Sequence, residues 1–191
     1  VLIFGPSGSG KTTLLKLICG MIPHFSAGNS LRGDISFQKK SIFSHPPKNF
    51  FPGFAFIPST NIDLFFLTDN LENETALVRA ILNLDQATTQ TRLEEFLQFF
   101  PIVADLLKMN FSEMDKIHQK IGLIFIFYLQ GARLFLIDEL GDSNQLNKKV
   151  NWIEFFEFLS EQGKSVIYVD HFPIESSHHI WRIQERKLWI Q

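Results

Sequence analysis

Gly5-Pro6-Ser7-Gly8-Ser9-Gly10-Lys11-Thr12 is the stretch that decides the fold of this 191-residue chain. Its pattern, G-x-x-x-x-G-K-[ST], predicts a loop whose backbone N–H groups curl around phosphates. The apolar run Val1 to Phe4 predicts a buried strand before the loop, and Lys11 to Met21 predicts a helix after it. A glycine-rich turn without function is the alternative, and this strand-loop-helix context argues against it.

The loop predicts a nucleotide site for ATP, or a close analogue, together with Mg²⁺. Lys11 is expected to reach the β- and γ-phosphates, and Thr12 to bind Mg²⁺ through its hydroxyl. Thr13 begins the helix near the α-phosphate, and the helix adds its positive end. The predicted phosphate-binding residues are Gly5, Pro6, Ser7, Gly8, Ser9, Gly10, Lys11, Thr12 and Thr13.

Two carboxylates follow a second apolar strand. Leu134 to Ile137 predicts the strand, and Asp138 and Glu139 come directly after it. At the carboxyl end of a parallel sheet, Asp138 is expected to bind Mg²⁺ and Glu139 to orient an attacking water as the catalytic base. A solvated strand end without a role is the alternative.

A histidine ends a third apolar strand, predicted over Ser165 to Val169. His171 would reach the same edge of the sheet and contact the γ-phosphate as a catalytic residue, although a loop histidine without function is the alternative. His178 and His179 have no such placement, and we expect no metal binding by them.

The rest of the chain alternates strands with helices. Asn70 to about Met109 has helical periodicity, and we expect a helical subdomain over about residues 70–120. Further elements are predicted at Asp34 to Phe37, Phe54 to Ile57, His118 to Gln130, Trp152 to Gln162 and Ile180 to Ile190, the last as two short strands around a turn near Glu185. The predicted fold is three-layered α/β with a mainly parallel core sheet, in a single nucleotide-binding domain over residues 1–191.

Composition limits the partners and the compartment. The formal net charge of -2 gives no general attraction to nucleic acid, so none is expected as a partner. The single cysteine, Cys19, fits a reducing cytoplasm. The longest apolar stretch, Ile121 to Leu129, is too short to cross a bilayer. Because the chain opens inside a predicted strand, we expect that upstream sequence is missing.

The order of these motifs resembles the ABC transporter ATPase family over nearly the whole chain. Some tracts are similar to the ATPases of energy-coupling factor importers for vitamins and metal ions: Gly20-Met21-Ile22-Pro23-His24-Phe25-Ser26, Gly33-Asp34-Ile35, Phe56-Ile57-Pro58 and Leu64-Phe65-Phe66-Leu67-Thr68. The resemblance implies two nucleotide-binding domains that face each other, each ATP lying between the Walker motifs of one and the LSGGQ signature of the other. It also implies a transmembrane transporter subunit as a partner.

The signature is the main departure from that family. Its position is taken by Met114, Asp115, Lys116, Ile117 and His118. Asp115 would bring a negative charge close to the partner's γ-phosphate, and Ile117 would add a Cβ where the backbone must approach closely. We therefore expect one of the two composite sites to be crippled.

Two further positions depart from the family. Ser59 stands where relatives place a glutamine that touches Mg²⁺, so any metal contact of its shorter side chain is expected to be weak. Leu140-Gly141-Asp142-Ser143-Asn144-Gln145 replaces the family's P-T-S-A-L-D run. The aspartate that crosses between subunits in relatives is therefore absent at its position.

Three functions remain open from the sequence. The first is the ATP-hydrolysing subunit of an energy-coupling importer, at the cytoplasmic face of the membrane, paired with a second ATPase that has an intact signature. The second is a regulatory or inactive module that holds ATP without turnover. The third is a P-loop kinase, which is disfavoured because only Arg79 and Arg92 could serve an acceptor-binding lid.

Two interpretations are open for the surface around Phe50 to Phe56 and Leu64 to Phe66. One is an apolar groove that receives a helix of the membrane subunit, and the other is ordinary packing of these side chains in the core.

Overall fold

Six strands form one sheet in the computed structural model, which describes residues 1–24, 32–45, 48, 51–140, 152–171, 179–184 and 187–190. The strand order is β4-β5-β6-β1-β7-β8, and only the β7/β8 pair is antiparallel. The strands are β1 (Leu2–Phe4), β4 (Phe54–Ile57), β5 (Leu134–Asp138), β6 (Ser165–Asp170), β7 (Ile180–Gln184) and β8 (Lys187–Ile190). The predicted mainly parallel sheet is confirmed.

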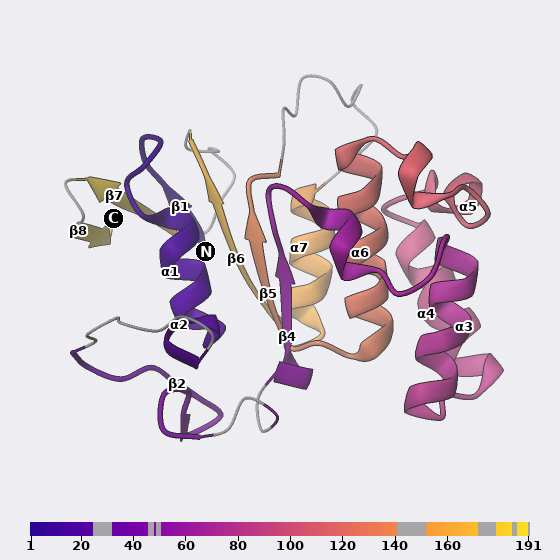
Figure 1. Cartoon of the computed structure of the whole chain (residues 1–191), viewed down its shortest axis with the longest axis horizontal. Helices are drawn as coiled ribbons and strands as arrows, with labels where there is room; N and C mark the ends of the chain where they lie inside the picture. Colours follow the sequence, from indigo (N-terminus) through magenta and orange to yellow (C-terminus); the bar gives the residue numbers. More distant parts are fainter. Residues whose placement is uncertain are drawn as a thin grey trace.

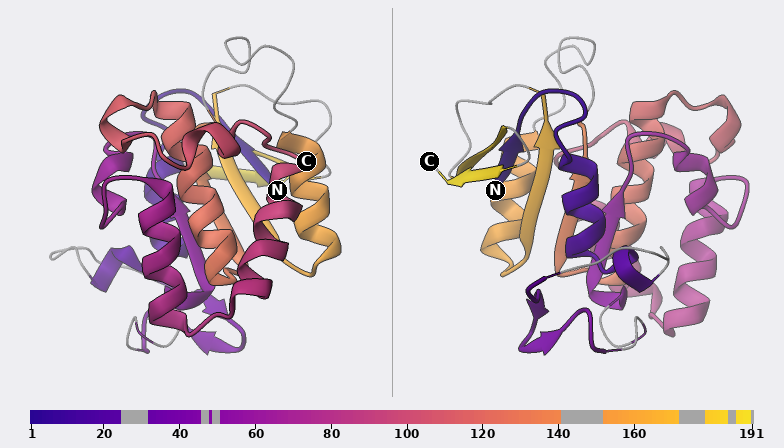
Figure 2. Two further views of the ribbon diagram at one scale, coloured as in Figure 1. Left: turned by 90° about the vertical axis from the view of Figure 1, so that its right-hand side faces the viewer. Right: turned by 60° about the vertical axis from the view of Figure 1, so that its left-hand side comes forward.

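Helices cover both faces of this sheet, as Figures 1 and 2 show. Helix α1 (Lys11–Ile18) lies on one face, whereas α6 (Lys116–Gln130) and α7 (Trp152–Glu161) lie on the other. Alternate residues of β5 belong to different cores: Phe135 and Ile137 pack in the larger core, and Leu134 and Leu136 in the smaller one beside α1. Residues 134–137 of β5 are all apolar, as expected for a strand that is buried on both faces.

The first helix is shorter than predicted. Helix α1 ends at Ile18, and a separate short helix, α2 (Met21–His24), follows it. Gly20 between them has a φ of +74°, in the left-handed region that ends helices. The expectation of one helix up to Met21 was therefore wrong at its carboxyl end.

The predicted helical region is present. Its helices are α3 (Leu71–Leu82), α4 (Gln86–Leu97) and α5 (Val103–Leu106), followed by the 3-10 turn η4 (Phe111–Glu113) and then α6. The side chains of Asn70 and Asp85 cap α3 and α4 by accepting from backbone N–H groups three residues later. Phe96 of α4 is fully buried against Phe125 of α6 and Phe155 of α7, so the helical region and the sheet share one core.

Two hairpins complete the described structure. The predicted edge strand near Asp34 to Phe37 is reduced to β2 (Ser36–Phe37), which pairs with β3 (Lys40–Ser41) outside the main sheet. The predicted final hairpin is confirmed as β7 and β8. Some residues that the sequence analysis singled out lie outside the described residues. They are Phe25, Ser26, the segment Gly141 to Gln145, His178 and Glu185.

The interpretation of residues 50–56 and 64–66 as an apolar groove is not supported. Phe54 and Phe56 are buried in β4, and Phe66 is buried after the 3-10 turn η3 (Ile62–Phe65), because these rings pack into the chain's own cores. Phe50, and the side chain of Phe51 in the 3-10 turn η2 (Phe51–Gly53), lie outside the described residues. Leu64, Phe65 and Leu67 are the exposed large apolar side chains among the described residues of this stretch. Among the described residues, no helix is both long and apolar enough to cross a membrane.

Candidate nucleotide-binding site

The predicted phosphate loop connects β1 to α1 at the carboxyl edge of the sheet (Figure 1). Gly8 and Gly10 have φ values of +74° and +101°, which residues with a side chain rarely adopt. A Cβ on Gly5 would lie 2.4 Å from the backbone oxygen of Ile183. Gly10 caps α1 without a side-chain hydrogen bond, so the first N–H groups of the helix stay available to a phosphate.

Lys11 lies within this loop. Its side chain is buried, and Nζ donates to the backbone oxygens of Gly5 at 2.8 Å and Pro6 at 3.1 Å. Burial of an ammonium group is unfavourable unless it is hydrogen-bonded, and these two carbonyls satisfy it. The loop therefore carries a fixed positive charge at the place where the motif expects phosphates.

Thr12, Asp138 and Ser59 meet beside Lys11. The Thr12 hydroxyl lies 3.0 and 2.9 Å from the two carboxylate oxygens of Asp138, and the Ser59 hydroxyl donates to Oδ2 of Asp138 at 3.2 Å. Asp138 is only 2% exposed. The short side chain of Ser59 thus reaches the carboxylate that was predicted to bind the metal.

These three residues fit Mg²⁺. Mg²⁺ prefers oxygen ligands, is commonly held by one or two protein carboxylates, and takes its other ligands from water and phosphate. The described residues contain no group of three or more His, Cys, Asp or Glu side chains placed to hold a metal ion. Thr12 and Asp138 would hold the metal, and a bound nucleotide and water would supply its other ligands.

Glu139 and His171 face each other across the ends of β5 and β6. Nε2 of His171 lies 3.0 Å from Oε1 of Glu139, and both side chains are partly exposed. The backbone N–H of Glu139 donates to the oxygen of Val169 at 3.0 Å, which joins the two strand ends. The structure thus brings together the predicted base and the predicted phosphate-contacting histidine.

A hollow of about 200 Å³ lies beside the phosphate loop. It is lined by Ser7, Gly8, Gly10, Lys11, Thr12, Thr13, Glu139 and His171. The lining thus combines loop glycines, a lysine and three hydroxyl side chains with a carboxylate and a histidine. That arrangement suits a polyphosphate whose last phosphate points toward Glu139.

Lys120 is a residue of this region that the sequence analysis missed. It is buried in α6, and its Nζ donates to the backbone oxygens of both Asp138 and Glu139. Burial lowers the pKa of Lys120, and the nearby carboxylates of Glu139, Asp138 and Asp170 oppose that shift. The available signal was a lysine directly before the apolar run Ile121 to Leu129.

The residues at the signature position form the start of α6. Asp115 caps this helix: its Oδ1 accepts from the N–H groups of Ile117 at 3.0 Å and His118 at 2.9 Å. Nδ1 of His118 also lies 3.0 Å from the same oxygen. Met114 is buried and Lys116 is exposed. None of these five residues lines the hollow beside the phosphate loop.

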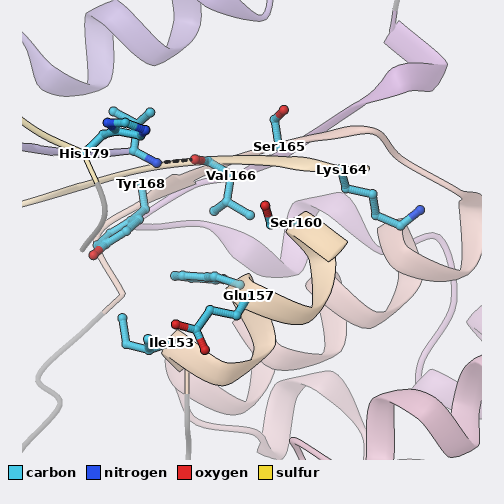
Figure 3. Close-up of a pocket in the computed structure, with 10 residues that line it drawn as sticks. Ile153, Glu157, Ser160, Lys164, Ser165, Val166, Tyr168 and His179 are labelled. Atoms are coloured by element: carbon cyan, nitrogen blue, oxygen red, sulfur yellow. Dashed lines mark hydrogen bonds between the residues drawn. The ribbon is translucent and has the colours of Figure 1, made fainter. Parts of the chain in front are cut away.

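A second hollow, of about 300 Å³, lies between α7 and β6 (Figure 3). Its lining includes Ile153, Phe156 and Val166, with Glu157 and Lys164 among the polar residues. It shares no lining residue with the hollow at the phosphate loop, and its surface is mainly apolar. It is therefore a poor site for phosphates.

The loop, the Thr12–Asp138 pair and the Glu139–His171 pair at one edge of a parallel sheet define a P-loop nucleotide-binding domain. Residues 1–140 match the model of the ABC transporter family. The chain belongs to this family.

Individual relatives agree with that assignment. An ABC transporter ATP-binding protein of Streptomyces avermitilis is 32% identical over 139 residues, which cover 73% of this chain and 24% of the relative. One of Treponema denticola is 26% identical and covers 90% of this chain and 34% of the relative. The chain thus spans about a quarter to a third of the length of these curated relatives.

Solved structures show the same fold. An ATP-binding subunit of an ABC transporter superposes with a TM-score of 0.73 at 20% identity, covering 97% of this chain and 74% of that one. The cbiO1 protein of Clostridium perfringens, part of the ABC transporter complex cbiONQ, gives 0.74 at 16% identity, covering 98% and 74%. At such identities the likeness concerns the fold alone.

Proposed function

We propose that this chain is an ATP-hydrolysing subunit of an ABC importer of the energy-coupling type. The observation that carries the proposal is the convergence of Lys11, Thr12, Asp138, Glu139 and His171 at one edge of the sheet. The groups needed to hold a triphosphate and to orient a water are all within this chain. The opposing signature would come from a partner.

The chemistry is transfer of the γ-phosphoryl group of ATP to water. Glu139 orients the water and accepts its proton while the water oxygen attacks the γ-phosphorus. The bond to the β–γ bridging oxygen breaks, and ADP leaves. Lys11 and His171 bind the phosphate oxygens, where charge redistributes in the transition state. Mg²⁺ bound at Thr12 and Asp138 would neutralise part of the phosphate charge.

The proposed pair of ATPase subunits is asymmetric. In an intact signature, the helix start offers its free N–H groups to the partner's γ-phosphate. Here the carboxylate of Asp115 already accepts from the N–H groups of Ile117 and His118. A second anion at this helix start would meet a like charge and no free donor at those two groups. The partner's nucleotide would therefore be poorly activated by this chain.

The importer type rests on the sequence tracts around Gly20 to Ser26 and Leu64 to Thr68. A transmembrane subunit would hold the chain at the cytoplasmic face of the membrane. Leu64 and Leu67, which are 75% and 77% exposed, lie in one of these tracts. No nucleic acid is expected as a partner, because the formal charge is -2.

One of the two arginines on which the kinase alternative depends has a structural role. Nη1 of Arg92 donates to the backbone oxygen of Leu129 at 2.5 Å, which is a structural contact on α6. The regulatory alternative keeps a specific observation in its favour, the self-capped helix start at Asp115. Under that alternative, the chain would bind ATP at Lys11 without useful turnover.

The deciding experiment compares Glu139→Gln in this chain with the equivalent change in the partner ATPase of the purified complex. If this chain supplies the working site, Glu139→Gln abolishes ATP turnover, whereas the partner's change has little effect. ATP binding should persist in Glu139→Gln, because Lys11 and Thr12 are intact. Unchanged turnover in Glu139→Gln would replace the proposal by the regulatory function.

A further inference from the structure

Lys120 contacts the turn that carries Glu139. It lies on α6, and its side chain is only 4% exposed. Nζ donates to the backbone oxygen of Asp138 at 3.1 Å and also to that of Glu139. One ammonium group thus binds two consecutive carbonyls at the end of β5. Lysines are rarely buried without such partners, because the charge must leave water.

The turn itself is unfavourable for a residue with a side chain. Glu139 has a φ of +58°, in the left-handed region where glycine is preferred. Such a conformation persists when neighbouring contacts fix it. At Glu139 the N–H is bound to Val169, and the carbonyls of Asp138 and Glu139 are bound to Lys120. The contacts therefore hold both peptide groups of this residue.

The direction of the Glu139 side chain depends on this turn. A change of φ toward the usual negative values would swing the Cα–Cβ bond away from its present direction. The carboxylate would then leave Nε2 of His171, which lies 3.0 Å away, and the wall of the hollow beside the phosphate loop. A general base must lie within hydrogen-bond reach of the proton that it accepts.

We propose that Lys120 is a positioning residue, which holds Glu139 in the left-handed turn that directs its carboxylate toward the phosphate loop. The inference rests on the proposed hydrolysis at this site and extends it to a residue that touches neither nucleotide nor water. The charge of Lys120 also lies near the carboxylates of Asp138, Glu139 and Asp170. It therefore offsets part of the repulsion among the three groups.

The test uses Lys120→Met in the purified complex with the partner ATPase. Methionine keeps most of the unbranched stem and removes the donor and the charge. Lys164→Met is the matched control, because Lys164 is partly buried over the ring of Tyr128 and lies outside the hollow at the phosphate loop. Lys120→Gln keeps one amide donor on a shorter stem and serves as a second variant if Lys120→Met does not fold.

Three quantities are measured: kcat and KM for ATP, affinity for a fluorescent ATP analogue, and hydrogen exchange of residues 138–140. For Lys120→Met we expect kcat to fall by about 10- to 100-fold with KM and nucleotide affinity changed less than about twofold. Exchange at residues 138–140 should become faster, and Lys120→Gln should give intermediate values. Lys164→Met should match the unmodified complex in kcat and in exchange.

The exchange measurement separates this inference from the proposed function. If the unmodified complex has no turnover, hydrolysis at this site is refuted, and exchange at residues 138–140 still decides whether Lys120 holds the turn. Unchanged exchange in both Lys120 variants overturns the positioning role. A loss of nucleotide affinity equal to the loss of kcat also overturns it, because Lys120 would then support the whole site rather than Glu139.

Discussion

The hydroxyl of Thr12 lies 2.9 Å from Oδ2 and 3.0 Å from Oδ1 of Asp138, although 126 residues separate them in the chain. This contact ties the first turn of α1 to the end of β5. It also places side by side the hydroxyl and the carboxylate that would bind a magnesium ion shared with a nucleotide. The site is thus preorganised by protein contacts.

Replacing Thr12 by valine should raise the Mg²⁺ concentration that half-activates turnover. Valine has nearly the same shape but no hydroxyl, so the site loses one oxygen group, and the carboxylate of Asp138 keeps the hydrogen bond from Ser59. The expected shift is about 10- to 150-fold, the equivalent of a lost hydrogen bond to a charged group. A Mg²⁺ titration of ATPase activity measures it, with Thr91→Val on exposed α4 as the control. An unshifted titration would remove Thr12 from the metal site.

Replacing Lys11 by methionine should weaken ATP binding. The ammonium group is held in the loop by Gly5 and Pro6 and is the only charged group of the loop itself. We expect the dissociation constant for ATP to rise by roughly 10- to 150-fold, the value of a charge-assisted hydrogen bond. Isothermal titration calorimetry measures the constant, and Lys16→Met at an exposed position of α1 is the control. Equal affinity in both variants would show that Lys11 does not contact the phosphates.

The positions of the main site residues could be predicted because they follow local patterns. Thr12 belongs to a contiguous motif, and Asp138, Glu139 and His171 come directly after apolar strands. Parallel strands bring such ends to one edge of a sheet. The strands themselves are apolar on both faces, which made β4, β5 and β6 recognisable.

Contacts between distant elements could not be predicted in this way. Lys120 lies in a helix whose periodicity gives no sign that Nζ reaches the carbonyls of Asp138 and Glu139. The weak metal contact expected of Ser59 stays a prediction, and its hydrogen bond to Asp138 depends on the register of β4 beside β5, which the sequence does not give. For the rings of Phe54, Phe56 and Phe66 both a groove and core packing were open, because apolar side chains look alike whether a surface or a core receives them.

Replacing Gly5 by alanine should destabilise the fold. The added Cβ would lie 2.4 Å from the backbone oxygen of Ile183, and a backbone atom cannot move aside as a flexible side chain can. The expected loss in the free energy of unfolding is about 1–3 kcal/mol. Gly122→Ala in α6 is the control: the nearest neighbours of its Cβ would be atoms of the Leu71 side chain, 3.1 Å or more away, and alanine favours the helix. Urea unfolding compares them, and equal stabilities would refute the clash.

Asp85 should contribute stability that depends on pH. Hydrogen bonds from the N–H and the hydroxyl of Thr88 lower the pKa of Asp85 in the folded chain. A lowered pKa adds stability above the ordinary value of 3.8, and that stability is lost as the pH falls through the folded value. Asp85→Ala should therefore lower the urea midpoint at pH 7, and the difference should shrink in acid. Asp63→Ala, at an exposed aspartate of η3, is the control, and a difference that persists in acid would contradict the assignment.

Restoring the family signature at residues 114–118 should activate the second nucleotide site of the complex. The variant Met114→Leu, Asp115→Ser, Lys116→Gly, Ile117→Gly and His118→Gln removes the carboxylate that now accepts from two N–H groups at the start of α6. Those donors then become available to the γ-phosphate held by the partner. With both sites working, turnover per complex roughly doubles.

In this variant, Glu139→Gln should abolish only the share of turnover that belongs to this chain's own site. Asp115→Ser alone should have a smaller effect, because Ile117 still places a Cβ near the partner's nucleotide. The contradicting outcome is that the variant with all five substitutions binds its partner and still leaves turnover unchanged. In that case the capping of α6 by Asp115 is not what makes the pair asymmetric.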